Sequence, residues 1–445
     1  MNILFISLGC DKNLSDSEEM LGLLTERGHN IVNSEEEADA IVINTCCFIH
    51  DAKEESVETI LEMAEYKKAG SLKALIVTGC MAQRYKEEII QEIPEVDAVL
   101  GTTSYSDIVK ALDEVLKGKS FQEFRDINEL PAVSASRVLT TGGHFGYLKI
   151  AEGCDKHCTY CIIPSLRGRF RSIPEERLIQ QAEYMASQGV KELILVAQET
   201  TVYGTDIYGK KTLHLLLKKL CGIKGIRWIR VLYCYPEEIY DELIQVMKEE
   251  KKICHYLDLP IQHASDRILK RMGRRTSKEQ LVEIIGKLRR EIPDIILRTT
   301  LITGFPGETE EDHQELMEFV DEMEFDRLGV FTYSAEEGTP AASMDGQIPE
   351  ELKEARRDEL MELQQEISLE KGNERIGQEL LVMIEGKVSG ESAYIGRTYG
   401  DAPNVDGYLF VQTGELLMTG DFAKVRVTGA MEYDLIGELA DEYTE

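Results

Sequence analysis

The chain has 445 residues, of which 43% are hydrophobic and 29% are charged, a balance typical of a globular protein of two or three domains. No apolar run approaches the roughly 18 residues of a membrane span, and the N-terminal residues lack the basic region of a secretory signal. Ten cysteines without such a signal predict a reducing compartment, the cytoplasm, and no membrane partner. The 81 acidic and 50 basic residues give a net charge of −31, which disfavours nucleic acid as a partner unless basic residues gather in one patch.

Residues 1–117 alternate short apolar runs with amphipathic segments, a pattern that predicts an open parallel α/β sheet covered by helices on both faces. We expect Asp16 or Ser17 to cap the first helix. The expected strands are 3–8, 40–44, 73–78 and 96–100, and the expected helices are 16–26, 52–68 and 107–116.

One cysteine follows each of the first three expected strands: Cys10, Cys46 and Cys80. Parallel strands end at the same edge of a sheet, where open α/β sheets bind ligands, so we expect the three thiols to converge there. The remaining cysteines outside the motif described below lack this arrangement, and we expect them to pack as small apolar side chains.

Residues 118–145 have a mixed charge pattern and are interpreted as a connection between domains. Residues 146–375 contain six strand–helix repeats, which predict a partial, TIM-like (β/α)6 barrel, followed by a charged docking helix with Leu352, Ala355, Leu360, Leu363 and Ile367 as its apolar stripe. Residues 376–445 change to five short alternating strands, which predict a small five-stranded β-barrel.

Three further cysteines, Cys154, Cys158 and Cys161, have C-x3-C-x2-C spacing directly after the first strand of the predicted barrel. Thiolates are the usual protein ligands of iron–sulfur clusters, and three ligands leave one iron open to a substrate. The spacing alone also permits a zinc site completed by His157, or a disulfide with one spare thiol.

Other predicted rim loops of the barrel carry polar groups that a ligand would need. The second loop contains Gln198 and Glu199, the fourth contains Gln262, and the fifth strand contains Arg298 and Thr300. The fifth strand ends in a Gly304–Thr309 segment whose glycines allow close backbone approach and whose Thr309 is placed to cap the next helix.

With Tyr160 before the last cysteine, the motif resembles that of the radical S-adenosylmethionine superfamily. The chain resembles the methylthiotransferases of that superfamily along nearly its whole length, including Ser7–Asn13, Asn44–Cys46, Thr78–Cys80 and Gly304–Thr309. The resemblance implies two [4Fe-4S] clusters, an auxiliary one on Cys10, Cys46 and Cys80 and a radical one on Cys154, Cys158 and Cys161. It also implies a TRAM-like C-terminal barrel.

In this family the radical cluster cleaves S-adenosylmethionine to a 5′-deoxyadenosyl radical, which abstracts a hydrogen from the substrate before a methylthio group is transferred. The electron comes from a low-potential donor such as flavodoxin or ferredoxin. We expect S-adenosylmethionine to be held by residues of the motif and the rim loops, with the Arg298 guanidinium on its carboxylate. These residues are Tyr160, Gln198, Glu199, Gln262, Arg298 and Thr300.

Two branches of the family differ in substrate: one thiomethylates a tRNA adenosine, and the RimO branch thiomethylates the β-carbon of an aspartate in ribosomal protein S12. Lys12–Asn13, Ala197–Gly204 and Gly396–Gly407 resemble the RimO branch. Independently, residues 373–445 hold 5 basic and 14 acidic residues, a net charge of −9 that suits a basic ribosomal protein and disfavours contact with RNA. The alternative from another class is a non-catalytic protein that holds structural metal and binds a ribosomal or RNA partner.

Overall fold

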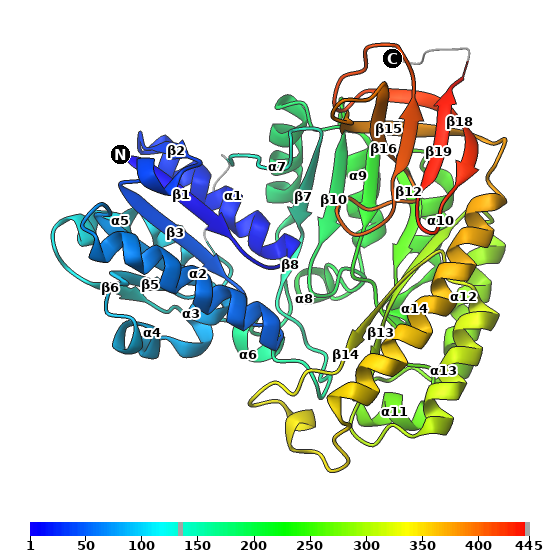
Figure 1. Ribbon diagram of the computed structural model, residues 1–445, viewed down its shortest axis with the longest axis horizontal. Helices are drawn as coiled ribbons and strands as arrows, with labels where there is room; N and C mark the ends of the chain where they lie inside the picture. The colour runs from blue at the N-terminus through cyan, green and yellow to red at the C-terminus, as the bar shows by residue number, and fades with distance from the viewer. Residues whose placement is uncertain (132–136, 441–445) are drawn as a thin grey trace.

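The computed structural model describes residues 1–131 and 137–440. Residues 132–136, inside the predicted connection, and residues 441–445, at the end of the predicted C-terminal barrel, lie outside the described residues. Three large sheets follow one another along the chain, with the N-terminal sheet on the left of Figure 1, the partial barrel in the centre and the small closed barrel at the top right. A fourth sheet consists only of two short strands in a loop of the partial barrel. No helix in the described ranges has the length and apolar character needed to cross a membrane.

The N-terminal sheet is parallel throughout, in the order β2-β1-β3-β4-β5-β6, which confirms the predicted open α/β architecture. Its two edge strands, β2 and β6, have three residues each and were not predicted, because so short a segment has no readable periodicity. The strands are β1 (Asn2–Ser7), β2 (Asn30–Val32), β3 (Ala40–Thr45), β4 (Ala74–Gly79), β5 (Ala98–Leu100) and β6 (Phe121–Glu123). The helices are α1 (Asp11–Glu26), α2 (His50–Lys68), α3 (Cys80–Tyr85), α4 (Glu87–Glu92) and α5 (Ile108–Leu116).

The start of α1 corrects the predicted cap. The helix begins at Asp11, directly after Cys10, so Asp16 and Ser17 lie inside it rather than at its N-terminus. Both are buried, because the polar face of α1 lies between the N-terminal sheet and the barrel strand β7 (Figure 1). The polar residues at the start of this helix therefore lie at a domain interface.

The central sheet has the parallel order β14-β13-β12-β11-β10-β7, which confirms the partial (β/α)6 barrel. Its strands are β7 (Phe145–Lys149), β10 (Glu192–Val196), β11 (Trp228–Val231), β12 (Ile253–Asp258), β13 (Ile296–Thr303) and β14 (Arg327–Thr332). The main helices are α7 (Glu175–Ser187), α9 (Leu213–Cys221), α10 (Asp241–Glu249), α12 (Lys278–Glu291) and α13 (Glu310–Met323). Short elements in its loops are β8 (Ala151–Glu152), α6 (Ile163–Arg167), β9 (Arg171–Ser172), α8 (Thr205–Tyr208) and α11 (Asp266–Arg271).

Helices cover the outer face of the central sheet, whereas the small C-terminal barrel covers part of its inner face. The outer face, with Leu148, Leu195 and Leu257, packs on the helices in the largest apolar core. The Thr309 cap predicted for α13 is confirmed, because its hydroxyl accepts a hydrogen bond from the Asp312 amide.

The helix after the barrel, α14 (Glu350–Asn373), corrects the predicted apolar stripe. Leu352 and Ala355 are exposed, whereas Lys353 and Arg356 are buried. Lys353 Nζ donates to the Tyr333 carbonyl at 2.8 Å, and Arg356 forms an ion pair with Glu308 at 2.9 Å. Long polar side chains with buried partners thus replace the expected apolar contacts at the first half of this helix.

The C-terminal sheet closes into a five-stranded barrel in the order β15-β16-β17-β19-β18, as predicted. Its strands are β15 (Glu379–Lys387), β16 (Ala393–Thr398), β17 (Leu409–Gln412), β18 (Phe422–Ala430) and β19 (Leu435–Leu439). Met383 and Phe422 pack against Trp228 and other residues from the starts of the central strands. The small barrel therefore covers the inner face of the central sheet at its N-terminal end and leaves the opposite, C-terminal rim clear (Figure 1).

Candidate functional site

The first three predicted cysteines come together at the C-terminal edge of the N-terminal sheet. Asn13 of α1 joins their loops: its amide nitrogen donates to the Leu8 carbonyl at 3.0 Å and to the Thr45 carbonyl at 2.9 Å, and its amide oxygen lies 3.9 Å from Cys80 Sγ. The backbone beside Cys10 is so close to Cys46 that a Cβ on Gly9 would lie 2.7 Å from Cys46 Cβ. Topology, rather than local sequence, thus makes a trio of Cys10, Cys46 and Cys80.

The second trio lies in the loop between β8 and α6, at the C-terminal rim of the central barrel. Cys154 and Cys158 are buried, and Cys161 is half-buried. The turn after α11 supports this loop, because the Thr159 amide donates to the Met272 carbonyl at 2.9 Å and Gly273 lies against the His157 carbonyl. A Cβ at Gly273 would lie 2.6 Å from that carbonyl oxygen, and the left-handed backbone of this residue, with φ of 74°, favours glycine.

The loop after β11 contacts the barrel trio and the residue next to Cys10 of the other trio. Tyr235 Oη lies 3.7 Å from Cys158 Sγ of the barrel trio. Two residues earlier, Tyr233 donates its hydroxyl to Asp11 Oδ2 at 3.1 Å, directly after Cys10. The backbone of Tyr233 is left-handed, with φ of 58°, an unfavourable conformation that cores and active sites hold in place. Because one short loop reaches both Cys158 and the residue directly after Cys10, the two trios lie near each other in the fold.

Three of the predicted ligand-holding residues have buried oxygen atoms without a hydrogen-bond partner among the described residues. These atoms are Gln198 Oε1, Glu199 Oε2 and Gln262 Oε1. Native proteins rarely leave buried polar atoms unpaired, so such atoms indicate a missing ligand. The backbone of Gln262 is also left-handed, with φ of 73°, and its backbone amide donates to the Thr300 carbonyl at 2.9 Å.

Glu199 has an environment that suits a ligand-binding carboxyl. Burial raises its pKa to about 7, although the Thr201 hydroxyl and the Lys156 ammonium, 3.9 Å from Oε2, favour the charged form. Tyr160, the remaining predicted residue of the motif, is half-buried with its ring edge-on to Phe305, 6.4 Å between centroids.

Arg298 of β13 is already paired with carboxylates, unlike the three unpaired oxygens. Its guanidinium donates to Asp258 at 2.9 Å and lies 3.5 Å from Asp406 of the small barrel. These two carboxylates hold the pKa of Arg298 above its usual value although burial opposes this. The structure therefore places this side chain at the contact between the two barrels.

Sequence reasoning missed Arg274, which lies beside the barrel trio. The residue is buried, and its guanidinium stacks over the Tyr235 ring at 4.3 Å. Nη2 donates to the Pro260 carbonyl at 2.7 Å, whereas Nε and Nη1 have no hydrogen-bond partner in the described part of the chain. The only signal in the sequence was its basic neighbourhood, which surface residues share.

The chemistry of both trios fits iron–sulfur clusters. All ten cysteines are free, and the Lys156 amide donates to Cys154 Sγ at 3.4 Å, the kind of contact that stabilises cluster sulfurs. Burial, the largest cause, and neighbouring thiols raise the pKa of Cys46, Cys154 and Cys161 to about 12. A buried thiol becomes a thiolate when metal supplies the positive charge.

A single-ion site has closer ligands than a cluster has. Within residues 1–131 and 137–440, no three side chains of His, Cys, Asp or Glu gather closely enough to hold one metal ion. His157, the ligand considered for a zinc site, is exposed on the outside of its loop.

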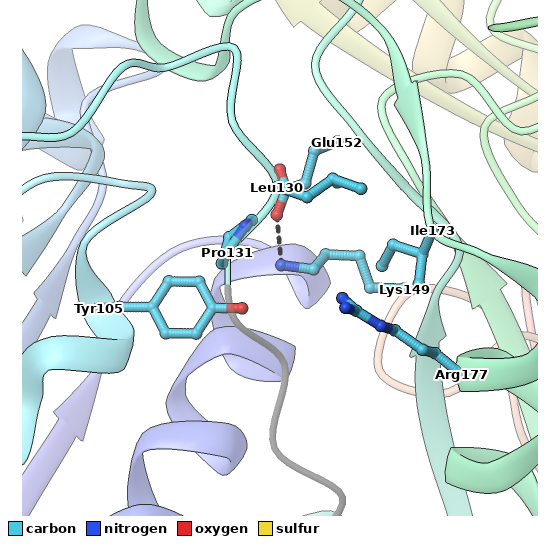
Figure 2. A pocket seen from close by; sticks show the side chains of 7 residues that line it. All are labelled: Tyr105, Leu130, Pro131, Lys149, Glu152, Ile173 and Arg177. Carbon is cyan, nitrogen blue, oxygen red and sulfur yellow. Dashed lines mark hydrogen bonds and ion pairs between the residues drawn. The ribbon is translucent and has the colours of Figure 1, made fainter. Parts of the chain in front are cut away.

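A buried charge network joins the helix that follows Cys10 to the loops of the central barrel. Lys149 of β7 forms ion pairs with Asp16 of α1 and with Glu152. Arg167, at the end of α6, also pairs with Asp16 at 2.8 Å and donates to Asn13 Oδ1 at 2.5 Å. Figure 2 shows Lys149 and Glu152 facing each other beside Tyr105, where Pro131 and Arg177 close the space around them. The helix that follows the barrel trio is thereby anchored to the cradle of the other trio.

Comparison with known proteins agrees with this division of the chain. Uncharacterized protein family UPF0004 matches residues 2–101, the Radical SAM superfamily matches residues 148–320, and the TRAM domain matches residues 376–440. A protein of Lachnoclostridium phytofermentans named ribosomal protein uS12 methylthiotransferase RimO is 66% identical over 98% of this chain and 99% of its own length. The chain belongs to the RimO family. The family resemblance drawn from the motifs is confirmed.

Other members of the RimO family are almost as widely matched. Proteins of the same name from Pelotomaculum thermopropionicum and Clostridioides difficile are 52% and 50% identical, across 97% and 99% of this chain and 98% and 99% of their own. Among solved structures, the radical S-adenosylmethionine methyltransferase TsrM from Kitasatospora setae, with cobalamin and a [4Fe-4S] cluster bound, is similar with a TM-score of 0.56 and 12% identity. The similarity covers 76% of this chain and 73% of TsrM. At that identity the likeness shows the fold alone.

Proposed function

We propose that the chain is a radical S-adenosylmethionine enzyme that methylthiolates the β-carbon of an aspartate in ribosomal protein S12. The observation that carries this proposal is the arrangement of two cysteine trios around one space, in a chain of the RimO family. The Tyr233–Tyr235 loop contacts both sides of that space. A substrate placed there lies beside both trios at once.

Each trio would hold a [4Fe-4S] cluster: Cys154, Cys158 and Cys161 the radical one, and Cys10, Cys46 and Cys80 the auxiliary one. When bound, these groups supply reductive cleavage of S-adenosylmethionine and the methylthio group that the substrate receives. The protein contributes placement and exclusion of water. The buried contacts of Arg167 with Asp16 and Asn13 fix the distance between the two loops.

We propose that S-adenosylmethionine is held by the unpaired oxygens of Gln198, Glu199 and Gln262, with Tyr160 and Thr300 beside them. These atoms are acceptors, and the amino and hydroxyl groups of the ligand are donors. Arg298 remains a candidate for the ligand carboxylate only through the part of its guanidinium not used by Asp258 and Asp406. The Arg274 guanidinium, with two unpaired nitrogens, is an additional candidate for that carboxylate.

The electron donor, the cellular location and the domain boundaries are also part of this proposal. A low-potential donor such as flavodoxin or ferredoxin would supply the electron. The ten free cysteines support a cytoplasmic location, and the acidic C-terminal barrel disfavours contact with RNA. We propose domain boundaries near residues 117, 145 and 375, with the N-terminal sheet completed by β6 at 121–123, beyond the first boundary.

A competition assay tests the substrate. The reconstituted enzyme receives ribosomal protein S12 and a tRNA anticodon stem together, and we expect the methylthio group on the protein only. Modification of the RNA alone would favour the tRNA branch. The non-catalytic alternative predicts stoichiometric zinc, no iron after anaerobic reconstitution and no cleavage of S-adenosylmethionine on reduction.

Replacing Glu199 tests the proposed S-adenosylmethionine site. Glu199→Gln keeps the shape of the side chain but removes its charge, so we expect affinity for S-adenosylmethionine to fall about 10- to 100-fold. Equilibrium dialysis with the oxidised, cluster-loaded protein measures this directly. Glu183→Gln, on the exposed side of α7, is the matched control and should bind normally. Unchanged affinity in Glu199→Gln would remove this residue from the site.

A further inference from the structure

Lys12 is a buried cation without an anionic partner. Only 7% of the residue is exposed. Its Nζ lies 3.2 Å from the centroid of the Tyr233 ring, and this cation–π contact is its only side-chain interaction in the part of the chain that the structure describes. A lysine this deeply buried normally pairs its ammonium with a negative charge or with several acceptors.

The two carboxylates that bind Tyr233, the residue under this ammonium, already have other donors. Asp11 accepts the Tyr233 hydroxyl at 3.1 Å. Asp258 accepts the Tyr233 amide at 3.1 Å and the Arg298 guanidinium at 2.9 Å. Among the described residues, neither carboxylate forms an ion pair with Lys12, whereas Asp258 forms one with Arg298. The ammonium of Lys12 is therefore available to bind an anionic group of a ligand.

The position of Lys12 indicates what the partner is. The residue follows Cys10 by two positions, and the ring under its ammonium belongs to the loop that reaches Cys158 through Tyr235. Lys12 therefore faces the space between the two trios, where the reacting carbon of the substrate must lie. In an aspartate, the carboxylate is bonded directly to that β-carbon.

We propose that Lys12 binds the side-chain carboxylate of the substrate aspartate, an inference that rests on the function proposed above. Lys12 is then a specificity-determining residue: it compensates its own buried charge with that of the substrate and fixes the β-carbon beside the reacting groups. A neutral adenine base offers no such charge. The rigid Tyr233 ring holds the ammonium in place, and Asp11 holds the ring.

The test compares two synthetic peptides of the target loop of ribosomal protein S12, one with aspartate at the modified position and one with asparagine. Affinities are measured with the oxidised, cluster-loaded enzyme and S-adenosylmethionine. We expect the wild-type enzyme to prefer the aspartate peptide by about 10- to 100-fold. Lys12→Met should bind both peptides about equally, whereas Lys12→Arg should restore part of the preference because it keeps the charge.

Lys110→Met is the matched control, since it removes one lysine charge from the same domain at a side chain that is 60% exposed; it should keep the wild-type preference. Iron content of each variant reports whether the auxiliary cluster is intact. If Lys12→Met lowers the affinity for both peptides by the same factor, the preference for aspartate is unchanged and the inference is wrong. Loss of iron in Lys12→Met would likewise show that Lys12 supports the cluster and not the substrate. Methylthiolation of RNA instead of ribosomal protein S12 by the wild-type enzyme would instead contradict the proposed function.

Discussion

Replacing Cys46 with alanine should lower the iron content from about eight to about four atoms per chain and abolish methylthio transfer, while cleavage of S-adenosylmethionine persists. The physical reason is the separation of the two trios: Cys46 belongs to the N-terminal sheet, whereas the cleavage site is built on the barrel loop with Cys154. Iron analysis, 5′-deoxyadenosine release and product mass measure the three quantities. Cys10→Ala and Cys80→Ala should behave in the same way.

Cys47→Ala is the matched control for this prediction. Cys47 is adjacent in sequence and fully buried, but it packs in an apolar core of the N-terminal domain as expected for a small side chain. It should keep both its iron and its transfer activity. Equal loss of cleavage and transfer in Cys46→Ala would contradict separate roles for the trios, and loss of iron in Cys47→Ala would contradict the assignment of ligands.

Replacing Glu192 with glutamine should destabilise the protein by about 3–5 kcal/mol, the usual cost of removing one partner from a buried ion pair. Glu192 lies between Arg230 of the central barrel and Arg397 of the small barrel, at 2.8 Å from each, and all three side chains are fully buried. The substitution leaves Arg230 without its acidic partner, whereas Arg397 keeps only Glu385, 2.7 Å from its Nε. The change in the free energy of unfolding, measured in urea, checks the prediction.

The same group predicts a pH dependence. Burial raises the pKa of Glu192, but the guanidiniums of Arg397 and Arg230 outweigh it and hold the pKa below its usual value of 4.5. A lowered pKa in the folded state means that the stabilisation is complete above pH 4.5 and is lost as the pH falls through the folded value. Glu192→Gln should therefore lose part of the acid sensitivity of the wild type. If Glu192→Gln lowers the free energy of unfolding by less than about 1 kcal/mol, the cost of losing an exposed ion pair, Glu192 is not essential to the contact between the barrels.

Much of the architecture could be predicted because it depends on local patterns. Near-continuous apolar strands, such as 40–44 and 192–197, predicted parallel sheets, and turn residues after residue 376 predicted the small barrel. The two short edge strands escaped prediction for want of length. The start of α1 was placed too late because its polar residues, Asp16 among them, have partners more than a hundred positions away in Lys149 and Arg167.

The candidate site, like the fold, could be predicted only in part from the sequence. Its cysteines could be found because three of them share one loop and three follow successive strands, so spacing and strand direction suffice. The polar rim residues were only named as candidates, since nothing in the sequence tells an unpaired Gln262 oxygen from the Arg298 guanidinium that Asp258 and Asp406 occupy.

The sequence by itself thus determined the three sheets, the positions of the six cysteines and the family, because each depends on residues close together in the chain or on a motif. Only the tertiary structure decided which charges are paired. It joined Asp16 to Lys149, set Glu192 between two arginines and left Lys12 without an anion. Such pairings depend on distances across domain interfaces, where residues far apart in sequence meet and burial makes each missing partner costly.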